Sequence, residues 1–197
     1  MKKTSSPTKN ADDKSEQKEV FVESSPLEKF FVAQLKDMYY AERRITETLD
    51  EMASSCNSEE LEDAISSHRR QTDRHVKRLE KIFGMIGTDA AEKKCEAIEG
   101  LIKEAREIRD MTREGTATRD AALIIALQKI EHYEIATYGG LLELALTMDL
   151  HNAASLLDKS LREEEQADAE LTEIAESFIN VRAEQEGPYS WQELQEA

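Results

Sequence analysis

The feature that most constrains the fold of this chain is a long stretch without proline. Its three prolines are Pro7, Pro26 and Pro188, so none lies between residues 27 and 187. Across this stretch apolar residues recur every three or four positions, which is the period of one face of an α-helix. Strands would need alternating or β-branched runs bounded by Gly- and Pro-rich turns, and such runs are missing. We therefore predict an all-α protein.

Four long segments carry the helical period, and a shorter one lies between the second and the third. Their expected bounds are 26–55, 58 to 84 or 87, 91–111, 116 or 118 to 148, and 151–184. Short connections join the first two long segments and the last two, so each pair should form an antiparallel hairpin. The connection of roughly thirty residues in the middle can travel the length of a bundle. We expect a ferritin-like four-helix bundle with an extra helix in its long crossover.

The chain divides into three parts. Residues 1–26 are rich in Ser, Lys, Asp, Thr and Glu and poor in apolar residues, which predicts a disordered tail. Residues 27–186 form the predicted bundle. Residues 187–197 form a C-terminal extension that holds the only tryptophan, Trp191.

The chain is strongly acidic. It has 26 basic and 42 acidic side chains, and its formal charge is −16 at pH 7. Such a surface repels nucleic acid and anionic lipid and attracts cations. No apolar run is long enough to span a membrane, and no apolar segment follows the first residues as in a secretory signal. Because Cys56 and Cys95 provide no disulfide framework, we expect a cytoplasmic protein without nucleic-acid or membrane partners.

Acidic, imidazole and amide side chains interrupt the apolar face of every long segment. In the first segment, for example, Glu42 falls in register with Met38 and Ile45. The spacings of three or four residues place each pair on one helical face. The residues concerned are Glu42 in the first segment, His68 and Gln71 in the second, Glu131 and Glu134 in the third long segment, and Glu164 and Asp168 in the fourth.

Carboxylates on a buried face are costly, and several at one level repel each other. Protonation, pairing with internal cations or metal binding would relieve the cost. Lys and Arg are absent from the equivalent positions of the first, third and fourth long segments, which weakens the pairing explanation. Oxygen and imidazole ligands suit iron or manganese, and helical bundles hold two irons between such side chains. We therefore predict that these seven residues bind metal.

Other polar or small residues near these positions have simpler interpretations. We interpret His75 as an ordinary buried histidine and His132 as a surface or supporting residue. Tyr138 is expected to be a core aromatic residue with a hydrogen-bonded hydroxyl near the metal site. Gly139-Gly140 predicts the close approach of another helix or a local bulge.

Four motifs give the chain a recognisable signature. They are LKDMYYAE (35–42), KCEAIEGLIKEA (94–105), RDAALIIALQKIEHYEIATYG (119–139) and EEEQAD (163–168). With these motifs the chain resembles the YciF-like bacterial stress proteins of the ferritin-like superfamily. The resemblance implies a rubrerythrin-like four-helix bundle, usually dimeric, with a di-metal site and no established reaction. By position it points to the same seven residues.

The chain also departs from the pattern of that superfamily. Its iron enzymes usually carry Glu-x-x-His on the second and fourth helices. Here the second long segment reads His68-x-x-Gln71, and no histidine lies near Glu164. With fewer imidazoles and one carboxylate missing, we expect weaker iron binding, or one metal held better than the other.

Two functions remain open at this point. The first is a ferritin-like protein that binds iron or manganese and oxidises Fe(II) or consumes peroxide in stress protection. The second is a non-catalytic helical-bundle homodimer with a structural or interaction role, its acidic interior protonated or filled with water. The sequence does not decide whether the protein is an enzyme.

Overall fold

The computed structural model describes residues 25–188, which contain helices and no strand. The predicted all-α fold is therefore confirmed. The elements are α1 (Pro26–Ala53), α2 (Glu59–Met85), α3 (Glu96–Asp110), α4 (Ala117–Thr147), α5 (His151–Ile174), the π-helical turn η1 (Ala175–Ile179) and α6 (Asn180–Glu184). Apart from residues 25, 26, 187 and 188, the predicted tail and C-terminal extension, Trp191 included, lie outside the described residues.

Side-chain caps fix the starts of three long helices. Ser25 accepts a hydrogen bond from the backbone N of Glu28 at 3.1 Å, and the Glu28 carboxylate accepts one from the backbone N of Ser25 at 2.6 Å. The hydroxyls of Ser58 and Thr116 accept from the backbone N three residues further on. Each cap satisfies an amide that has no partner within its helix. These helices thus begin close to their predicted positions.

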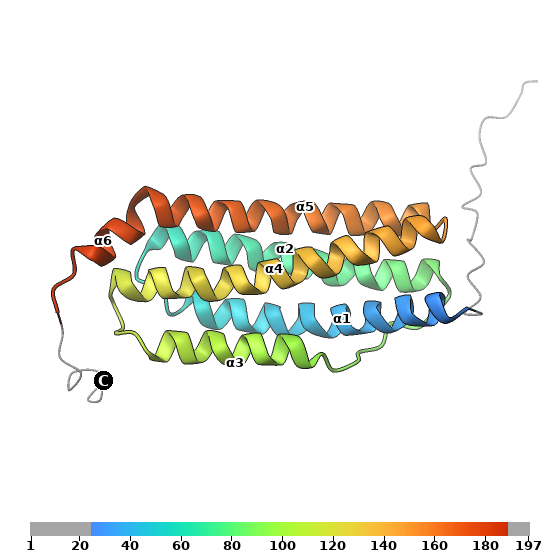
Figure 1. Cartoon of the computed structure of the whole chain (residues 1–197), viewed down its shortest axis with the longest axis horizontal. Helices are drawn as coiled ribbons and strands as arrows, with labels where there is room; N and C mark the ends of the chain where they lie inside the picture. The colour runs from blue at the N-terminus through green and yellow to red at the C-terminus, as the bar shows by residue number, and fades with distance from the viewer. Residues whose placement is uncertain (1–24, 189–197) are drawn as a thin grey trace, which may run out of the picture.

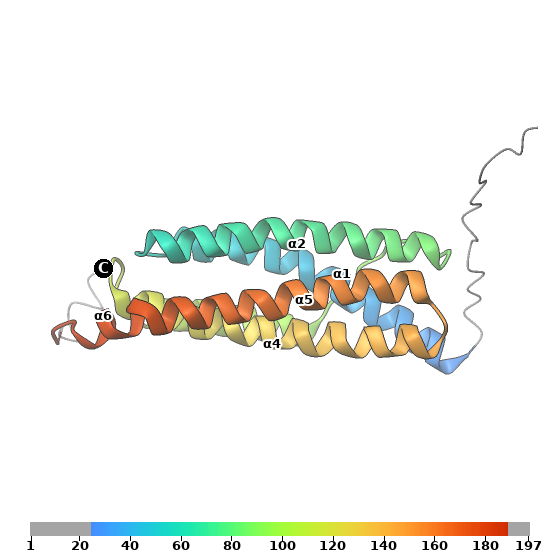
Figure 2. The same cartoon turned by 90° about the horizontal axis from the view of Figure 1, so that it is seen from above.

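The chain order is that of two hairpins joined by a long crossover. In Figure 1, α1 and α2 form one antiparallel pair and α4 and α5 the other, while α3 carries the chain back to the end where α1 finishes. Figure 2 shows α2 on the opposite side of the bundle from α4. The Asn57 backbone N in the α1–α2 turn donates to the carboxylate of Asp120 in the first turn of α4 at 2.7 Å. The predicted extra helix in the crossover is α3.

The helix in the crossover begins later than predicted, at Glu96 rather than near residue 91. The residues before it lie against α1. There the Lys93 backbone N donates to the carbonyl oxygen of Lys36 at 3.2 Å, and the Lys93 side chain pairs with Asp37 at 3.0 Å. These contacts hold residue 93 against α1, ahead of the first turn of α3.

The last predicted segment, 151–184, is not one regular helix. The turn η1 interrupts it, and Ile179 is buried. A regular α-helix continuing from Ala175 would instead turn Phe178 toward the core. A π-helical turn inserts an extra residue into the helical pattern, which changes the side chains that face the core. Phe178 is only partly buried, and the guanidinium of Arg182 lies 4.7 Å from the centre of its ring.

Within residues 25–188, neither feature predicted for Gly139-Gly140 is present. The helix α4 runs unbroken through both glycines. A Cβ atom built on either would meet nothing within 4 Å apart from its immediate chain neighbourhood. Neither a bulge nor a close helix from residues 25–188 explains this pair.

Apolar layers enclose the middle of the bundle from both ends. Leu35 and Met38 of α1 are buried on one side of Glu42, and Ile45 and Leu49 are buried on the other. The remaining helices contribute similar layers, so polar groups in the middle are cut off from solvent. None of the helices within residues 25–188 is long and apolar enough to cross a membrane.

Candidate metal centre

Six acidic and imidazole side chains from four helices meet in the middle of the bundle. All six are buried, and the most accessible, His68, exposes only 7% of its surface. The set consists of Glu42 from α1, His68 and His75 from α2, Glu131 and Glu134 from α4, and Glu164 from α5. We call these six residues the carboxylate–histidine cluster.

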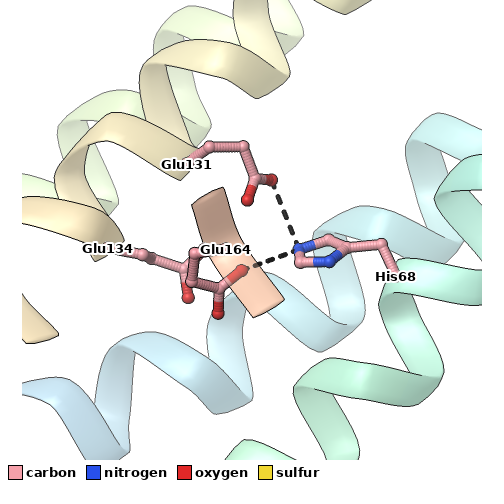
Figure 3. Close-up of side chains that lie close together, drawn as sticks. All are labelled: His68, Glu131, Glu134 and Glu164. Atoms are coloured by element: carbon pink, nitrogen blue, oxygen red, sulfur yellow. Dashed lines mark ion pairs between the residues drawn. The ribbon is translucent and has the colours of Figure 1, made fainter. Parts of the chain in front are cut away.

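The carboxylate–histidine cluster divides into two groups that share one residue. In each group, ligand atoms from every member lie within 4.8 Å of one another. The first group is shown in Figure 3, where the His68 ring points between Glu131 and Glu164, with Glu134 beside Glu164. The second group joins Glu42, His75 and Glu164. Glu164 belongs to both groups: its Oε2 faces His68 and its Oε1 faces His75.

In the first group, His68 presents Nε2 to the carboxylates. This atom lies 3.3 Å from Oε1 of Glu131 and 3.5 Å from Oε2 of Glu164. The other ring nitrogen, Nδ1, lies 3.1 Å from Oε1 of Gln71. The amide oxygen of Gln71 accepts only, so in the neutral imidazole Nδ1 carries the proton and Nε2 has a lone pair directed at the carboxylates.

In the second group, His75 also has one nitrogen facing the cluster and one facing outward, but here Nδ1 faces the cluster and Nε2 faces outward. Its Nδ1 lies 2.7 Å from Oε1 of Glu164 and 3.4 Å from Oε1 of Glu42. Its Nε2 lies 2.8 Å from Oε2 of Glu163, and Arg78 donates two hydrogen bonds to that carboxylate, at 2.9 and 2.7 Å. A carboxylate behind the outer nitrogen is the usual support of a metal-binding histidine.

The inner atoms of the cluster have no hydrogen-bond partners. Among residues 25–188, ten buried side-chain nitrogen and oxygen atoms lack such a partner, and nine of them belong to this cluster. They include Nδ1 of His75, although it lies close to Glu164. A hydrogen on Nδ1 of His75 would not point at the Glu164 oxygen, so the two atoms do not form a hydrogen bond. Lone pairs on the same atoms need only point toward a common position. Orphaned polar atoms at such density are of the kind that ordered water or a bound cation satisfies.

Burial and mutual repulsion keep protons on two of the carboxylates when no cation is present. Burial, with the charges of Glu164 and Glu42, raises the pKa of Glu134 well above its ordinary value. Burial also raises the pKa of Glu164, to about 7, against the opposing effect of His75. These protons must leave before the carboxylates can act as ligands.

The pKa values of both histidines are raised as well, here by the neighbouring carboxylates and against the effect of burial. Burial lowers the pKa of His68, but Glu131 and Glu164 outweigh it and bring the pKa to about 9. At His75, burial is outweighed by Glu42, Glu163 and Glu164, and the pKa rises to about 12. Protonated histidines thus compete with a metal ion for the same carboxylates.

Tyr138 borders the cluster. It is buried, as predicted, and its hydroxyl donates a hydrogen bond to Oε1 of Glu42. Burial and the nearby charge of Glu42 raise its pKa well above the ordinary value, so the hydroxyl keeps its proton. Its ring meets His75 edge-on, with centres 5.9 Å apart. Tyr138 therefore orients one ligand and packs against another.

The structure brings five of the seven predicted ligands together, and two lie elsewhere. Gln71 lies one step outside the cluster, behind His68. Asp168 is partly exposed; it accepts a hydrogen bond from Gln128 at 3.2 Å and lies 3.4 Å from Nε2 of His132. The short side chain of Asp168, one turn from Glu164, does not reach the interior. His132 is exposed, in agreement with its predicted surface position.

Two residues of the site escaped the sequence prediction. His75 follows His68 after two helical turns, a spacing that places both imidazoles on one face of α2. That spacing was the available signal. Glu163 gave none, because it stands in a run of three glutamates that reads as a solvated surface.

His75 also corrects the expectation of a ligand-poor site. The cluster contains four glutamates and two histidines. This is the composition of carboxylate-bridged di-iron sites in four-helix bundles, although there each histidine comes from a different helix. The chain therefore lacks neither an imidazole nor a carboxylate; α2 supplies both imidazoles and α4 supplies two carboxylates.

Comparisons with known proteins agree with this architecture. Protein YciF from Escherichia coli K12 is 39% identical over 159 residues, covering 80% of this chain and 95% of the relative. The crystal structure of the E. coli stress protein YciF matches with a TM-score of 0.75 and 38% identity, covering 79% of this chain and 98% of that one.

Other solved structures share the fold. YcfI from Rhodopseudomonas palustris matches with a TM-score of 0.73 and 33% identity, covering 75% of this chain and 94% of that chain. A Xanthomonas campestris protein, at 20% identity and a TM-score of 0.62, shows the fold alone. The model of a domain of unknown function, DUF892, matches residues 26–184. The chain therefore belongs to the DUF892 family and is related to the stress protein YciF along nearly its whole helical bundle.

Proposed function

We propose that this protein is a cytoplasmic stress protein whose carboxylate–histidine cluster binds two cations, iron or manganese. The observation that carries the proposal is the set of nine orphaned ligand atoms enclosed by apolar layers. A cation pair gives all of these atoms a partner at once. Protonation alone would leave several lone pairs unmet, which is costly in a dry interior.

Each residue has a definite part in this proposal. Glu42 and His75 hold one cation, His68, Glu131 and Glu134 hold the other, and Glu164 serves both. With iron bound, the pair supplies one-electron redox chemistry, which couples oxidation of Fe(II) to reduction of peroxide or dioxygen.

The supporting residues keep the ligands in place before any cation binds. Glu163, fixed by Arg78, directs Nδ1 of His75 inward. Tyr138 holds Glu42 through a hydrogen bond. Since these partners fix orientation, little reorganisation accompanies metal binding.

A non-catalytic role as a homodimer is the second candidate, and a groove on α1 and α4 favours it. Phe30 is 53% exposed and lines this groove with Tyr133, Leu141 and Leu144. Gly140 also lines it, and that glycine has open space beside it. A helix of a second copy would bury the apolar groove at the glycine pair. Dimerisation is compatible with metal binding as well as with a purely structural role.

Metal analysis of Glu164→Gln tests the proposal. Protein purified without chelator, loaded anaerobically with Fe(II) or Mn(II) and desalted, should contain about two metal ions per chain by mass spectrometry. Glu164→Gln should contain less than one, because the shared ligand is weakened for both positions. Glu165→Gln, the exposed neighbour, should match the wild type. The proposal would be overturned if the wild-type protein contained no metal and its melting temperature did not change on adding metal. That result would favour the structural role.

Turnover is tested separately from binding. The Fe(II)-loaded protein should consume added hydrogen peroxide and yield Fe(III), followed by its near-ultraviolet absorption and by residual peroxide. Fe(II) in buffer and the Glu164→Gln protein serve as controls. Metal binding without faster oxidation than in buffer would leave a metal-binding protein and remove the proposed reaction.

A further inference from the structure

An acidic groove lies on the surface between α2 and α5. It has a volume of about 410 Å³ and extends along η1, where Ser177 and Phe178 form part of its wall. Four acidic side chains line it and no basic side chain does: Glu60, Asp63, Glu170 and Glu173. We call it the acidic groove.

The acids of this groove have no basic partners. None of the four forms an ion pair with another residue in the range 25–188. Elsewhere on the surface acids are commonly paired, for instance Glu51 with Arg106 and Arg109. Unpaired like charges beside a low-dielectric wall concentrate a negative potential at the groove.

A second hollow lies between this groove and the cluster, next to both. Ala64 and Glu170 line both spaces. The inner hollow is narrow, with a volume of about 10 Å³, which is close to the space of one water molecule. Most of the residues that line it are apolar, and the polar ones include His68 and Glu131. We call it the neck.

The inner end of the neck presents buried ligand atoms without partners. His68 is more than nine-tenths buried, and its Nε2 has no hydrogen-bond partner. Glu131 is buried as well, and neither of its carboxylate oxygens has one. The path thus begins at unpaired acids and ends at orphaned ligands of the candidate metal centre.

We propose that metal cations reach the carboxylate–histidine cluster through the acidic groove and the neck between α2 and α5. This inference rests on the proposed metal-binding function and adds the route. The acidic groove raises the local concentration of divalent cations, as charged clefts do for oppositely charged ligands. The neck admits an ion only after it has lost most of its water, and His68 and Glu131 replace that water.

Kinetics of Co(II) uptake separate the route from the site. Co(II) is stable in air, and its visible absorption changes when nitrogen and oxygen ligands bind it. The test protein combines Asp63→Asn, Glu170→Gln and Glu173→Gln. Glu60 is kept, since it lies in the first turn of α2 and favours the helix N-terminus. The matched control removes three exposed acids at the other end of the bundle: Asp89→Asn, Glu143→Gln and Asp149→Asn.

The groove variant should take up Co(II) about tenfold more slowly than the wild type at low salt. The difference should shrink near about 0.5 M salt, where surface charges are screened. The final amount bound should stay the same, because no cluster residue is changed. Equal slowing in the control protein would show an effect of net charge alone and overturn the route. A lower final amount with an unchanged rate would make the groove a separate binding site and also overturn it.

The neck is tested by filling it. Ala64→Leu should slow Co(II) uptake at every salt concentration while the final amount bound stays at the wild-type value. Ala169→Leu, on the exposed side of α5, is the control and should behave as the wild type. Unchanged uptake in Ala64→Leu would overturn the neck as the passage. If wild-type protein itself binds no Co(II), the metal-binding proposal fails, which is a different outcome from failure of the route.

Discussion

Glu163 illustrates how a residue outside the cluster sets the chemistry inside it. Its carboxylate joins the outer nitrogen of His75 to Arg78, and the hydrogen bond from His75 keeps its pKa low. The charge therefore stays next to the imidazole and makes the inner nitrogen a better ligand. Such a carboxylate tunes metal affinity without touching the metal.

We predict that Glu163→Gln weakens metal binding by about 10- to 100-fold. The amide keeps an acceptor for His75 but loses the charge and the paired hydrogen bonds from Arg78. The measurement is a competition titration of Co(II) against a chelator of known affinity. Glu165→Gln, the exposed neighbour on α5, is the control. Equal affinity in the two variants would mean that the Glu163 charge does not act on His75.

The pKa values of the cluster predict how stability varies with pH after metal removal. The pKa of His68 rises from 6.5 to about 9, and that of Glu164 rises from 4.5 to about 7. Both groups hold protons more tightly in the folded state, so folding takes up protons between about pH 4.5 and 9. The contribution of His68 is complete below pH 6.5 and is lost as pH rises through 9.

The melting temperature of chelated protein should therefore fall as pH rises from about 5 to 9. The increase in melting temperature on adding Mn(II) should grow over the same range, because binding displaces those protons. Scanning calorimetry of both forms measures the two trends. A chelated protein with a level profile would contradict the assignment of buried protons to this cluster.

At the scale of single residues, the sequence predicted the site because charged groups occupied apolar positions. Glu42, Glu131 and Glu164 were found in this way, since each falls in register with buried neighbours. Asp168 obeyed the same spacing but lies too far round α5 to reach the interior. Periodicity predicts which face of a helix a residue lies on, but not how far its side chain extends. It also gives the same pattern for a histidine that binds metal and for one that packs in the core, as at His75.

At the scale of elements, the turn between α1 and α2 is tied to the start of α4. Asp120 is buried and accepts a hydrogen bond from the backbone N of Asn57. Burial raises its pKa, against the lowering effect of the amides of Asn57 and Ser58. This contact fixes which end of the bundle α4 begins from, and thereby the level at which its glutamates enter the interior.

We predict that Asp120→Ala lowers the free energy of unfolding by about 1–3 kcal/mol, because the backbone amides of Asn57 and Ser58 lose the buried carboxylate that accepts from them. Asp120→Asn keeps an acceptor oxygen and should lose less. Urea unfolding followed by circular dichroism measures both. At saturating metal, both variants should bind the wild-type amount, since no ligand is changed. Equal stability of the alanine variant and the wild type would show that Asp120 does not hold the turn.

The helices themselves were predictable from period and caps, whereas two local features were not. Lys93 donates its amide to α1, a contact between distant segments that no local pattern reports. The turn η1 depends on how Ile179 packs after Ala175, and an α-helical period placed Phe178 there instead. Both differences arise from tertiary packing, which outweighs local preference.

At the scale of the whole molecule, the groove around Phe30 predicts association with a second copy. We expect Phe30→Ser to shift the protein from dimer to monomer in light scattering coupled to size exclusion, because it removes exposed apolar surface at the centre of the contact. The control is Met111→Ser, which changes a more exposed apolar residue near the other end of the bundle and should leave the mass unchanged. A monomeric wild-type protein would exclude this interface.

The shared carboxylate of Glu164 comes from the last long helix, while Glu42 comes from the first. A ribosome must therefore release almost the entire bundle before the two can face each other. In nascent or truncated chains that end before α5, the remaining acids of the cluster are open to water. We expect such chains to bind a redox-active ion weakly. If the cluster binds iron as proposed, capture has to wait until synthesis is complete, which would keep reactive iron away from half-made protein.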